Sequence, residues 1–380
     1  MLRHWTDVEL AELLASAGLS GVPEEPFPTD GWSGATFSLL RAQGGDRFVL
    51  KRDAYATNWI ARATADTGLR EAVIAAHVAG GGIEAPGSIG VPYIGAARDG
   101  EGVAILTPDL SGKLIGWEDR HPVATFDSAA LTTVIGAVAE LHASPGTLWP
   151  TDDATGAMPW CPLRQRLLLL ARPSAQRYAD EGTWVGERFI AGWDAFDRLA
   201  SAPARRLIET LSADPAPLIA ALDRLPSVAL HGDLKLSNVG LLHGGRITLI
   251  DWQMTLRAPV AVELGWFLVS NVALLPLAPV PILDAYRDRL RRHIADRGRR
   301  QTGRVRAGRG LAGHERRDWD GLIGDWEMQV DLAWIVGLLL RGWRKGLDAQ
   351  AGVSHPSGVA TVDDLAWWCA KAVQAAERRL

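Results

Sequence analysis

Short apolar runs of β-forming residues, separated by glycine turns, characterise the first hundred residues. Residues 30–51 are expected to form strands joined by a glycine turn and by a hairpin turn at Gln43-Gly44-Gly45-Asp46. Two more strands are expected over 91–99 and 102–106. Together these segments predict a five-stranded sheet near the N-terminus.

Apolar residues at helical spacing dominate the rest of the chain. The segment 67–79 lies among the strands and combines helical periodicity with good helix formers. Further helices are expected over 129–142, within 145–226, over 319–346 and over 361–380. Beyond the last expected strand the chain is therefore predicted to be mainly helical.

The first twenty residues predict a short amphipathic helix rather than a signal peptide. Acidic residues interrupt the part in which a signal peptide has its apolar core. Thr6 and Glu9 have the spacing of a capping box, and Gly18 is placed to end the helix.

The tract from Val228 to Trp252 carries polar residues at fixed offsets. They are His231, Asp233, Asn238 and Asp251, the last delivered by an apolar run at 246–250 that predicts a strand. Phosphoryl transfer needs such a set, because one carboxylate must meet a substrate hydroxyl while an amide oxygen and a second carboxylate hold Mg²⁺. A simpler interpretation makes Asp233 and Asn238 turn formers and Asp251 a helix cap.

The same tract resembles a known family. It reads HGDLKLSN and then IDW, where protein kinases have H-R-D-L-x-x-x-x-N and then D-F-G. In this form it is similar to the aminoglycoside phosphotransferase and choline kinase family of kinase-like enzymes. Short motifs spread over residues 32–267 carry the resemblance.

The resemblance implies an α+β fold with two lobes, like that of protein kinases. The small N-lobe, expected over residues 1–106, would contain an antiparallel sheet plus one key helix and bind the nucleotide. The larger, mainly helical C-lobe, expected over 107–380, would carry the catalytic loop and bind the acceptor.

Roles for the residues of the tract follow from the resemblance. Asp233 would orient the acceptor hydroxyl and accept its proton, and Lys235 would approach the γ-phosphate of ATP. Asn238 and Asp251 would bind Mg²⁺. His231 would brace the loop by hydrogen bonding. Two residues outside the loop, His142 and Glu263, are also expected to be structural.

Lys51 and Glu71 are expected to form a pair in the N-lobe. Lys51 ends a β-rich run and occupies the position of the third-strand lysine that contacts the α- and β-phosphates in kinases. Glu71, on the predicted helix 67–79, would orient Lys51 through an ion pair. The alternative is a solvated glutamate that the helix dipole stabilises.

A reduced glycine loop is expected to cover the phosphates. Gly31 and Gly34 would let backbone N–H groups approach the oxygens, and Ser33 would cover the β-phosphate. The G-x-G-x-x-G pattern is incomplete at this place.

The string AILTPDLSG at 104–112 resembles the linker between the lobes, where adenine bonds to the backbone. Pro108 has no N–H, so Thr107, Asp109 and Leu110 are the candidate donors.

The segment after Asp251 favours a small-molecule hydroxyl acceptor, because it lacks the A-P-E signature and the length of a protein-kinase activation segment. On a predicted helix, Glu327 and Asp331 share a face, with Trp326 and Trp334 nearby. Acids beside aromatic rings would suit a cationic acceptor, such as an amino sugar, an aminoglycoside or an amino alcohol. The alternative is a solvent-facing acidic stripe beside a packed aromatic stripe.

Composition and charge argue against other partners. A net charge of −4 predicts no general attraction to nucleic acid or membrane, and no apolar stretch reaches the roughly 20 residues of a spanning helix. Two cysteines, Cys161 and Cys369, are too few for a disulfide framework, which fits a cytoplasmic location. The Arg/Gly-rich tract 297–313 lacks interleaved aromatics, so a solvated loop is expected there.

The leading hypothesis is an ATP- and Mg²⁺-dependent O-phosphotransferase that acts on a small molecule. An alternative is a kinase-like protein that binds nucleotide or ligand without turnover, and a third is an RNA-associated factor that acts through residues 297–313. The identity of the acceptor, the choice between ATP and GTP, and the oligomeric state stay open.

Overall fold

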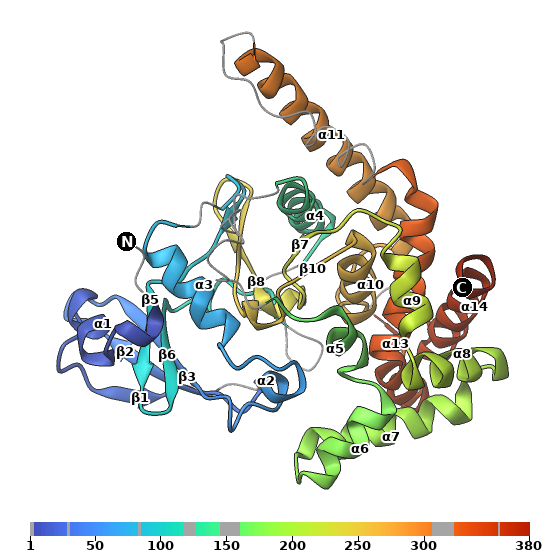
Figure 1. The fold of residues 1–380 in the computed structure, drawn as a ribbon, viewed down its shortest axis with the longest axis horizontal. Coiled ribbons are helices and arrows are strands. Elements are labelled where there is room, and N and C mark those ends of the chain that lie inside the picture. Colours follow the sequence, from blue (N-terminus) through green and yellow to red (C-terminus); the bar gives the residue numbers. More distant parts are fainter. Residues whose placement is uncertain are drawn as a thin grey trace.

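The structure, a computed structural model, describes residues 4–28, 31–82, 85–116, 126–144, 160–305, 323–355 and 358–380. Figure 1 shows a sheet-containing part at one end, a larger helical part at the other, and short strands between them. The expected α+β architecture, with a small sheet lobe and a larger helical lobe, is confirmed. The boundary proposed between residues 106 and 107 falls inside β6 (Gly102–Pro108).

Five strands form the antiparallel sheet that the sequence predicts. Their spatial order is β1 (Glu24–Pro26), β2 (Thr36–Arg41), β3 (Arg47–Asp53), β6 and β5 (Gly95–Asp99). The strand expected at the start of 30–51 is wrong, because the first strand lies further back, at β1. That strand is exposed along its length at the edge of the sheet, so it has no apolar pattern to reveal it.

The turn between β2 and β3 is the predicted hairpin. The Ala42 N–H donates to the Asp46 carbonyl at 2.9 Å, and the Gly45 N–H donates back to the Ala42 carbonyl at 2.9 Å. Gly45 has φ +88°, a conformation that L side chains rarely adopt. The hairpin therefore sets the register of β3, which carries Lys51 opposite Ile105 of β6.

The helix predicted over 67–79 is α3 (Arg70–Ala79), which lies beside the sheet (Figure 1). It begins three residues later than expected. Leu69 has φ +51° and ends the preceding turn, and the Asp66 carboxylate accepts the Arg70 N–H at 2.9 Å. Glu71 therefore lies in the first turn of the helix, on a buried face.

The N-terminal segment departs from its predicted cap. A 3₁₀ turn covers Trp5–Asp7, with the His4 side chain as its cap, and α1 (Leu10–Ser16) follows with Glu9 as a cap that makes no side-chain hydrogen bond. The capping box of Thr6 and Glu9 is therefore wrong, because the 3₁₀ turn separates the two residues from a single helix start. Gly18, with φ +71°, does follow the end of α1, and its N–H donates to the Ala15 carbonyl at 3.1 Å.

Helices make up most of the larger lobe. They are α4 (Ser128–His142), α5 (Leu163–Leu168), α6 (Arg172–Asp180), α7 (Trp184–Leu199), α8 (Ala202–Ala213), α9 (Ala216–Leu222), α10 (Val260–Ser270), α11 (Pro279–Val305), α13 (Trp326–Ala351) and α14 (Thr361–Arg379), and the short α2 (Trp59–Ala63) precedes α3. Helix α13 runs through the middle of the core, against α7, α10 and α14. A Cβ at Gly265 would lie 2.4 Å from the Ala333 carbonyl oxygen, so α10 and α13 approach to backbone contact.

Two small sheets carry the polar tract between the lobes. Strand β7 (Val228–Leu230) pairs with β10 (Leu256–Ala258), and β8 (Val239–Leu242) pairs with β9 (Arg246–Leu249). Strand β4 (Ile89–Gly90) joins β9 in parallel. The strand expected over 91–99 begins later than predicted, because only residues 95–99 form a strand, β5.

The arginine-rich tract begins inside a helix. Residues 297–305 are the last residues of α11, which projects from the body in Figure 1, so the expected loop is wrong for that stretch. Residues 306–313 of the tract lie outside the described residues. Along the described parts of the chain, no helix combines the length and the apolar character that a membrane crossing requires.

Candidate active site

The sharp turn after β7 depends on Gly232. This residue has φ +83°, and a Cβ added to it would lie 1.9 Å from the carbonyl oxygen of Met254. No other amino acid fits at this point without moving the backbone. The glycine of the HGD motif therefore brings the loop close to the segment after Asp251.

Glu263, in the first turn of α10, holds this turn from beneath. Its carboxylate accepts the backbone N–H groups of His231 at 3.0 Å and Gly232 at 2.6 Å, and it lies 2.9 Å from Nε2 of His142. Burial opposes ionisation of Glu263, but the hydrogen bond and charge of His142 outweigh it and hold its pKa below the ordinary value. His142 also contacts the Tyr286 hydroxyl at 2.7 Å through Nδ1. Glu263 and His142 thus make structural contacts, as the sequence suggested.

His231 joins the two halves of the tract. Its Nδ1 accepts the Asp233 N–H at 3.3 Å, which leaves Nε2 to donate to the Ile250 carbonyl at 2.9 Å. Because Ile250 precedes Asp251, one buried ring fixes the backbone beside both carboxylates.

Asp233, Lys235 and Asn238 meet at the loop. Oδ2 of Asp233 lies 2.9 Å from Nζ of Lys235 and accepts from Nδ2 of Asn238 at 3.2 Å. The same Asn238 amide nitrogen donates to the Asp233 carbonyl at 2.9 Å. The amide nitrogen is thereby committed, so Oδ1 is the atom of Asn238 that a cation can use.

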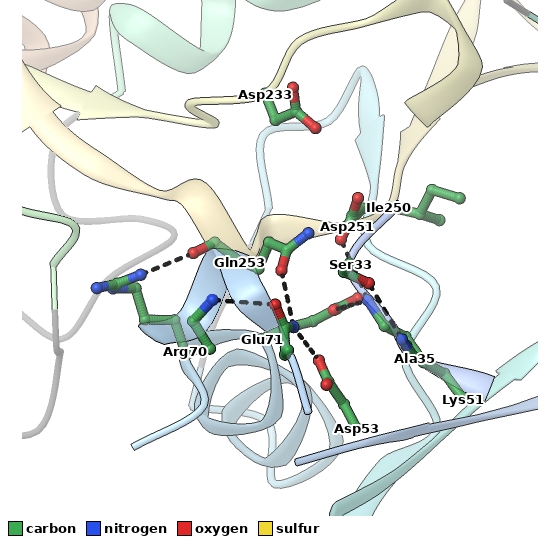
Figure 2. A network of polar contacts seen from close by, with 12 residues as sticks. Ser33, Ala35, Lys51, Asp53, Arg70, Glu71, Asp233, Ile250, Asp251 and Gln253 are labelled. Carbon is green, nitrogen blue, oxygen red and sulfur yellow. Dashed lines mark hydrogen bonds and ion pairs between the residues drawn. The ribbon is translucent and has the colours of Figure 1, made fainter. Parts of the chain in front are cut away.

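Asp251 and Glu71 both contact Lys51, from opposite lobes. Nζ of Lys51 lies 2.5 Å from Glu71 and 3.2 Å from Asp251, and Tyr93 donates to Glu71 at 2.8 Å. Figure 2 shows Lys51, Glu71 and Asp251 close together, with Asp233 across from them. Burial would lower the pKa of Lys51, but the charges of Asp251 and Glu71 raise it well above its ordinary value.

Asp251 adopts an unusual backbone conformation. Its φ is +62°, in the left-handed region that non-glycine residues rarely occupy. Burial opposes its ionisation, but Lys51 and Lys235 outweigh that effect, so its pKa is lowered. The carboxylate is therefore ionised at neutral pH.

One cavity of about 390 Å³ connects these residues. Its walls include Gly31, Ser33, Lys51, Glu71, Thr107, Asp109, Leu110, Asp233, Lys235, Asn238 and Asp251. Gly34 lies outside the walls, where its missing Cβ accommodates the Thr57 carbonyl. With that exception the structure brings the predicted nucleotide, metal and catalytic residues together.

The linker donors can be separated by their hydrogen bonds. The Asp109 N–H donates to the Arg47 carbonyl at 2.9 Å, so it is occupied. Hydrogen-bonded pairs recur at every second residue of an antiparallel ladder, so Thr107, two residues before Asp109, forms such a pair with Val49. The Thr107 N–H is therefore occupied as well. Among the described residues, the Leu110 N–H has no hydrogen-bond partner, which leaves it for a ligand.

Family comparison places this site in a known context. The sequence matches the phosphotransferase enzyme family over residues 25–302, which is most of the chain. The chain belongs to this family. It is therefore an enzyme of the small-molecule phosphotransferase class, as the HGD tract predicted.

Several solved structures resemble this phosphotransferase at low identity. Macrolide 2'-phosphotransferase MphH from Brachybacterium faecium has 18% identity, 96% coverage of each chain and a TM-score of 0.42. A choline/ethanolamine kinase family protein from Mesorhizobium loti has 17% identity, 97% coverage of each chain and a TM-score of 0.42. Amicoumacin kinase hAmiN has 13% identity and a TM-score of 0.49, and the match covers 95% of this chain and 92% of the kinase chain. A search of the curated proteins found no match.

The four residues proposed to bind a cationic acceptor do not line the cavity of the phosphotransferase. Asp331 lies 2.5 Å from Arg378 and 2.7 Å from Arg379 of α14. The other three are an exposed Glu327, a Trp326 stacked on Tyr286 and a Trp334 packed on Trp367 and Trp368. This acceptor prediction is therefore corrected: the acidic face of α13 meets arginines of a neighbouring helix, and the aromatic face is core.

Residues that sequence reasoning missed complete the site. Tyr93 orients Glu71, and Asn271 accepts the Leu236 N–H at 2.8 Å to support the segment after Asp233. Arg166 of α5 and Arg341 of α13 also line the cavity. None of them belongs to a motif, so their chemistry emerges only when distant helices are placed together.

Proposed function

We propose that this phosphotransferase moves the γ-phosphate of ATP to a hydroxyl group of a small molecule in a Mg²⁺-dependent reaction. The observation that carries the proposal is the shared cavity: the carboxylates of Asp233 and Asp251 lie in it together with Asn238 and Lys51. Phosphoryl transfer requires a base for the hydroxyl and positive charge for the phosphates within one site.

The residues of the site fit a magnesium ion. Oδ1 of Asn238 and the ionised carboxylate of Asp251 would hold it, in keeping with the preference of Mg²⁺ for one or two protein oxygens plus phosphate and water. The described parts of the chain contain no group of three or more His, Cys, Asp or Glu side chains that could hold a metal ion, so phosphate and water oxygens would supply the remaining ligands at this site. When bound, the ion would neutralise charge on the phosphates.

Each protein group then has a task that its contacts support. Asp233 would accept the hydrogen of the acceptor hydroxyl, with its own orientation fixed by Asn238 and Lys235. Lys51, held by Glu71, would bind the α- and β-phosphates, and the Leu110 N–H would bind adenine.

Measurement of ADP release tests the proposal. The protein is incubated with ATP, Mg²⁺ and a panel of acidic, neutral and basic hydroxyl compounds, and products are examined for the mass of one added phosphate. Asp233→Asn is expected to lower turnover by roughly 10²–10³. Asp223→Asn, an exposed aspartate at the end of α9, is the matched control and is expected to behave as wild type. Mg²⁺-dependent binding of an ATP analogue without ADP release for any acceptor would instead identify a binding protein.

A further inference from the structure

Two arginines at the helical end of the cavity have no task in the reaction proposed above. Arg166 and Arg341 are 1% and 2% exposed, and both line the cavity. Their guanidinium carbons lie 4.4 Å and 5.6 Å from the ring centre of Trp266. Two like charges are thus buried beside one indole ring, an arrangement that favours an anion at this place.

Arg166 has a donor that the protein does not satisfy. Its Nε donates to the Gly232 carbonyl at 3.0 Å, but Nη1 is buried without a hydrogen-bond partner. Arg166 also forms no ion pair with any residue that the structure describes. Arginine keeps its proton in proteins, so the unsatisfied group must be compensated by a ligand or remain a penalty.

The electrostatics of Arg166 agree with this geometry. Burial lowers the pKa of its guanidinium, and the charge of Arg341 acts in the same direction. Asp233 opposes the change, but it is already paired with Lys235.

The rest of this end of the cavity is aromatic and apolar. Its walls are Trp59, Leu169, Leu170, Phe189, Trp266 and Trp343, which together with the two arginines define the helical end of the cavity. Phe189 and Trp343 have ring centres 4.7 Å apart, and Arg341 lies 5.1 Å from the Trp343 ring centre. Asp233 is the one acid that the described walls present here, so a cationic acceptor would meet two buried positive charges.

We propose that the acceptor is an organic anion, with a carboxylate or related oxyanion on an aromatic or otherwise apolar body, and that Arg166 and Arg341 bind this oxyanion while the acceptor hydroxyl meets Asp233. The inference rests on the proposed function. Arg166 bonds to Gly232, the residue before Asp233, so the oxyanion and the reacting hydroxyl lie close enough to belong to one small molecule.

Binding of three matched fragments tests the inference without turnover. Benzoate, benzamide and benzylamine share one ring and differ in charge. Their affinities are measured by calorimetry or ligand-observed NMR with the full chain, first without nucleotide and then saturated with Mg²⁺ and a non-hydrolysable ATP analogue, which fills the phosphate end. Benzoate is expected to bind at least about tenfold more tightly than benzamide, with benzylamine weakest.

Arginine variants locate the preference. Arg166→Met and Arg341→Met are each expected to remove it, and Arg166→Lys to keep part of it. Arg177→Met is the matched control, because Arg177 lies 5.3 Å from the Tyr178 ring centre on the exposed face of α6 and outside the cavity walls. Circular dichroism of each variant separates loss of binding from loss of fold, and Arg341→Met keeps the test valid if Arg166→Met does not fold.

Several results would overturn the inference. They are equal or weaker binding of benzoate than of benzamide, no binding of any fragment, a preference that survives both methionine variants, and a preference that disappears once the ATP analogue fills its site. The last result would mean that the arginines bind phosphate of the nucleotide. Failure of ADP release alongside a retained benzoate preference would contradict the proposed function alone, because fragment binding requires no chemistry.

Discussion

Replacing Glu263 with glutamine tests how the loop before Asp233 is held. The wild-type carboxylate accepts two backbone N–H groups, from His231 and Gly232, and contacts Nε2 of His142, all in a site that is 1% exposed. Glutamine has nearly the same shape. It has one oxygen to accept and an NH₂ group that must face another donor.

The expected loss follows from these three contacts. Hydrogen bonds to a charged acceptor contribute about 1.5–3 kcal/mol each, and a buried donor left unsatisfied costs about 1–3 kcal/mol. Of the three contacts of the carboxylate, glutamine keeps one and weakens a second, because its oxygen carries no full charge. At the third contact the glutamine NH₂ group faces another donor. The free energy of unfolding should therefore fall by about 3–5 kcal/mol.

Urea unfolding and ADP release check this value. Glu187→Gln is the matched control, because Glu187 is also in the first turn of a helix, α7, but is exposed; its change should stay below about 1 kcal/mol. Turnover of Glu263→Gln should also fall, since Asp233 follows the two N–H groups that are released. A Glu263→Gln protein as stable as the Glu187→Gln protein would show that the loop is held by other contacts.

The stability difference between wild type and Glu263→Gln is also expected to depend on pH. The folded-state pKa of Glu263 lies below its ordinary value of about 4.3, so its stabilisation is complete above that pH and is lost as the pH falls through the folded value. The stability difference between wild type and Glu263→Gln should thus shrink on acidification below pH of about 4. A difference that grows on acidification would reverse the sign of the argument.

Three further substitutions probe other parts of the site. Gly232→Ala would place a Cβ 1.9 Å from the Met254 carbonyl and should lower ADP release by about a hundredfold or more, and wild-type turnover would refute the tight approach. Tyr93→Phe removes the hydrogen bond to Glu71 and should cost about 1 kcal/mol in urea unfolding and raise KM for ATP; an unchanged KM would show that Glu71 needs no second partner. Asp331→Asn should leave KM for every acceptor within about twofold, whereas a selective loss with basic acceptors would restore a role for this face of α13.

The sequence predicted that the proposed reacting groups lie together, because phosphoryl-transfer chemistry fixes residue types at short spacings. Asp233 and Asn238 lie five positions apart on one loop, and Asp251 follows a strand that its apolar run announces. Lys51 and Glu71 are further apart, but each lies on an element with clear periodicity, β3 and α3. At these positions the local sequence pattern and the chemistry of the residues agree, so they could be assigned with little knowledge of long-range contacts.

The acceptor end could not be predicted in the same way. The spacing of Asp331 to its neighbours in the sequence is the same whether its face of α13 meets solvent, substrate or the arginines of α14. Helix α14 begins 30 positions after Asp331, so the local pattern does not reveal this contact. Arg166 and Arg341 lie 175 positions apart in the sequence, on α5 and α13, and have no motif in common. They become functional candidates because both contact the ring of Trp266, a tertiary contact that no sequence spacing predicts.

The relation between the two carboxylates is itself a product of buried contacts rather than of the motif. Asp233 and Asp251 belong to separate loops, but His231 bonds to the Asp233 N–H with one ring nitrogen and to the Ile250 carbonyl with the other. The strained backbone of Asp251, with φ +62°, is thereby held on one side by this ring and on the other by Lys51. In the proposed reaction Asp233 is the base and Asp251 a metal ligand, and a single imidazole ring, that of His231, fixes the backbone beside both of them. This explains why a histidine that touches no reacting group still opens the motif.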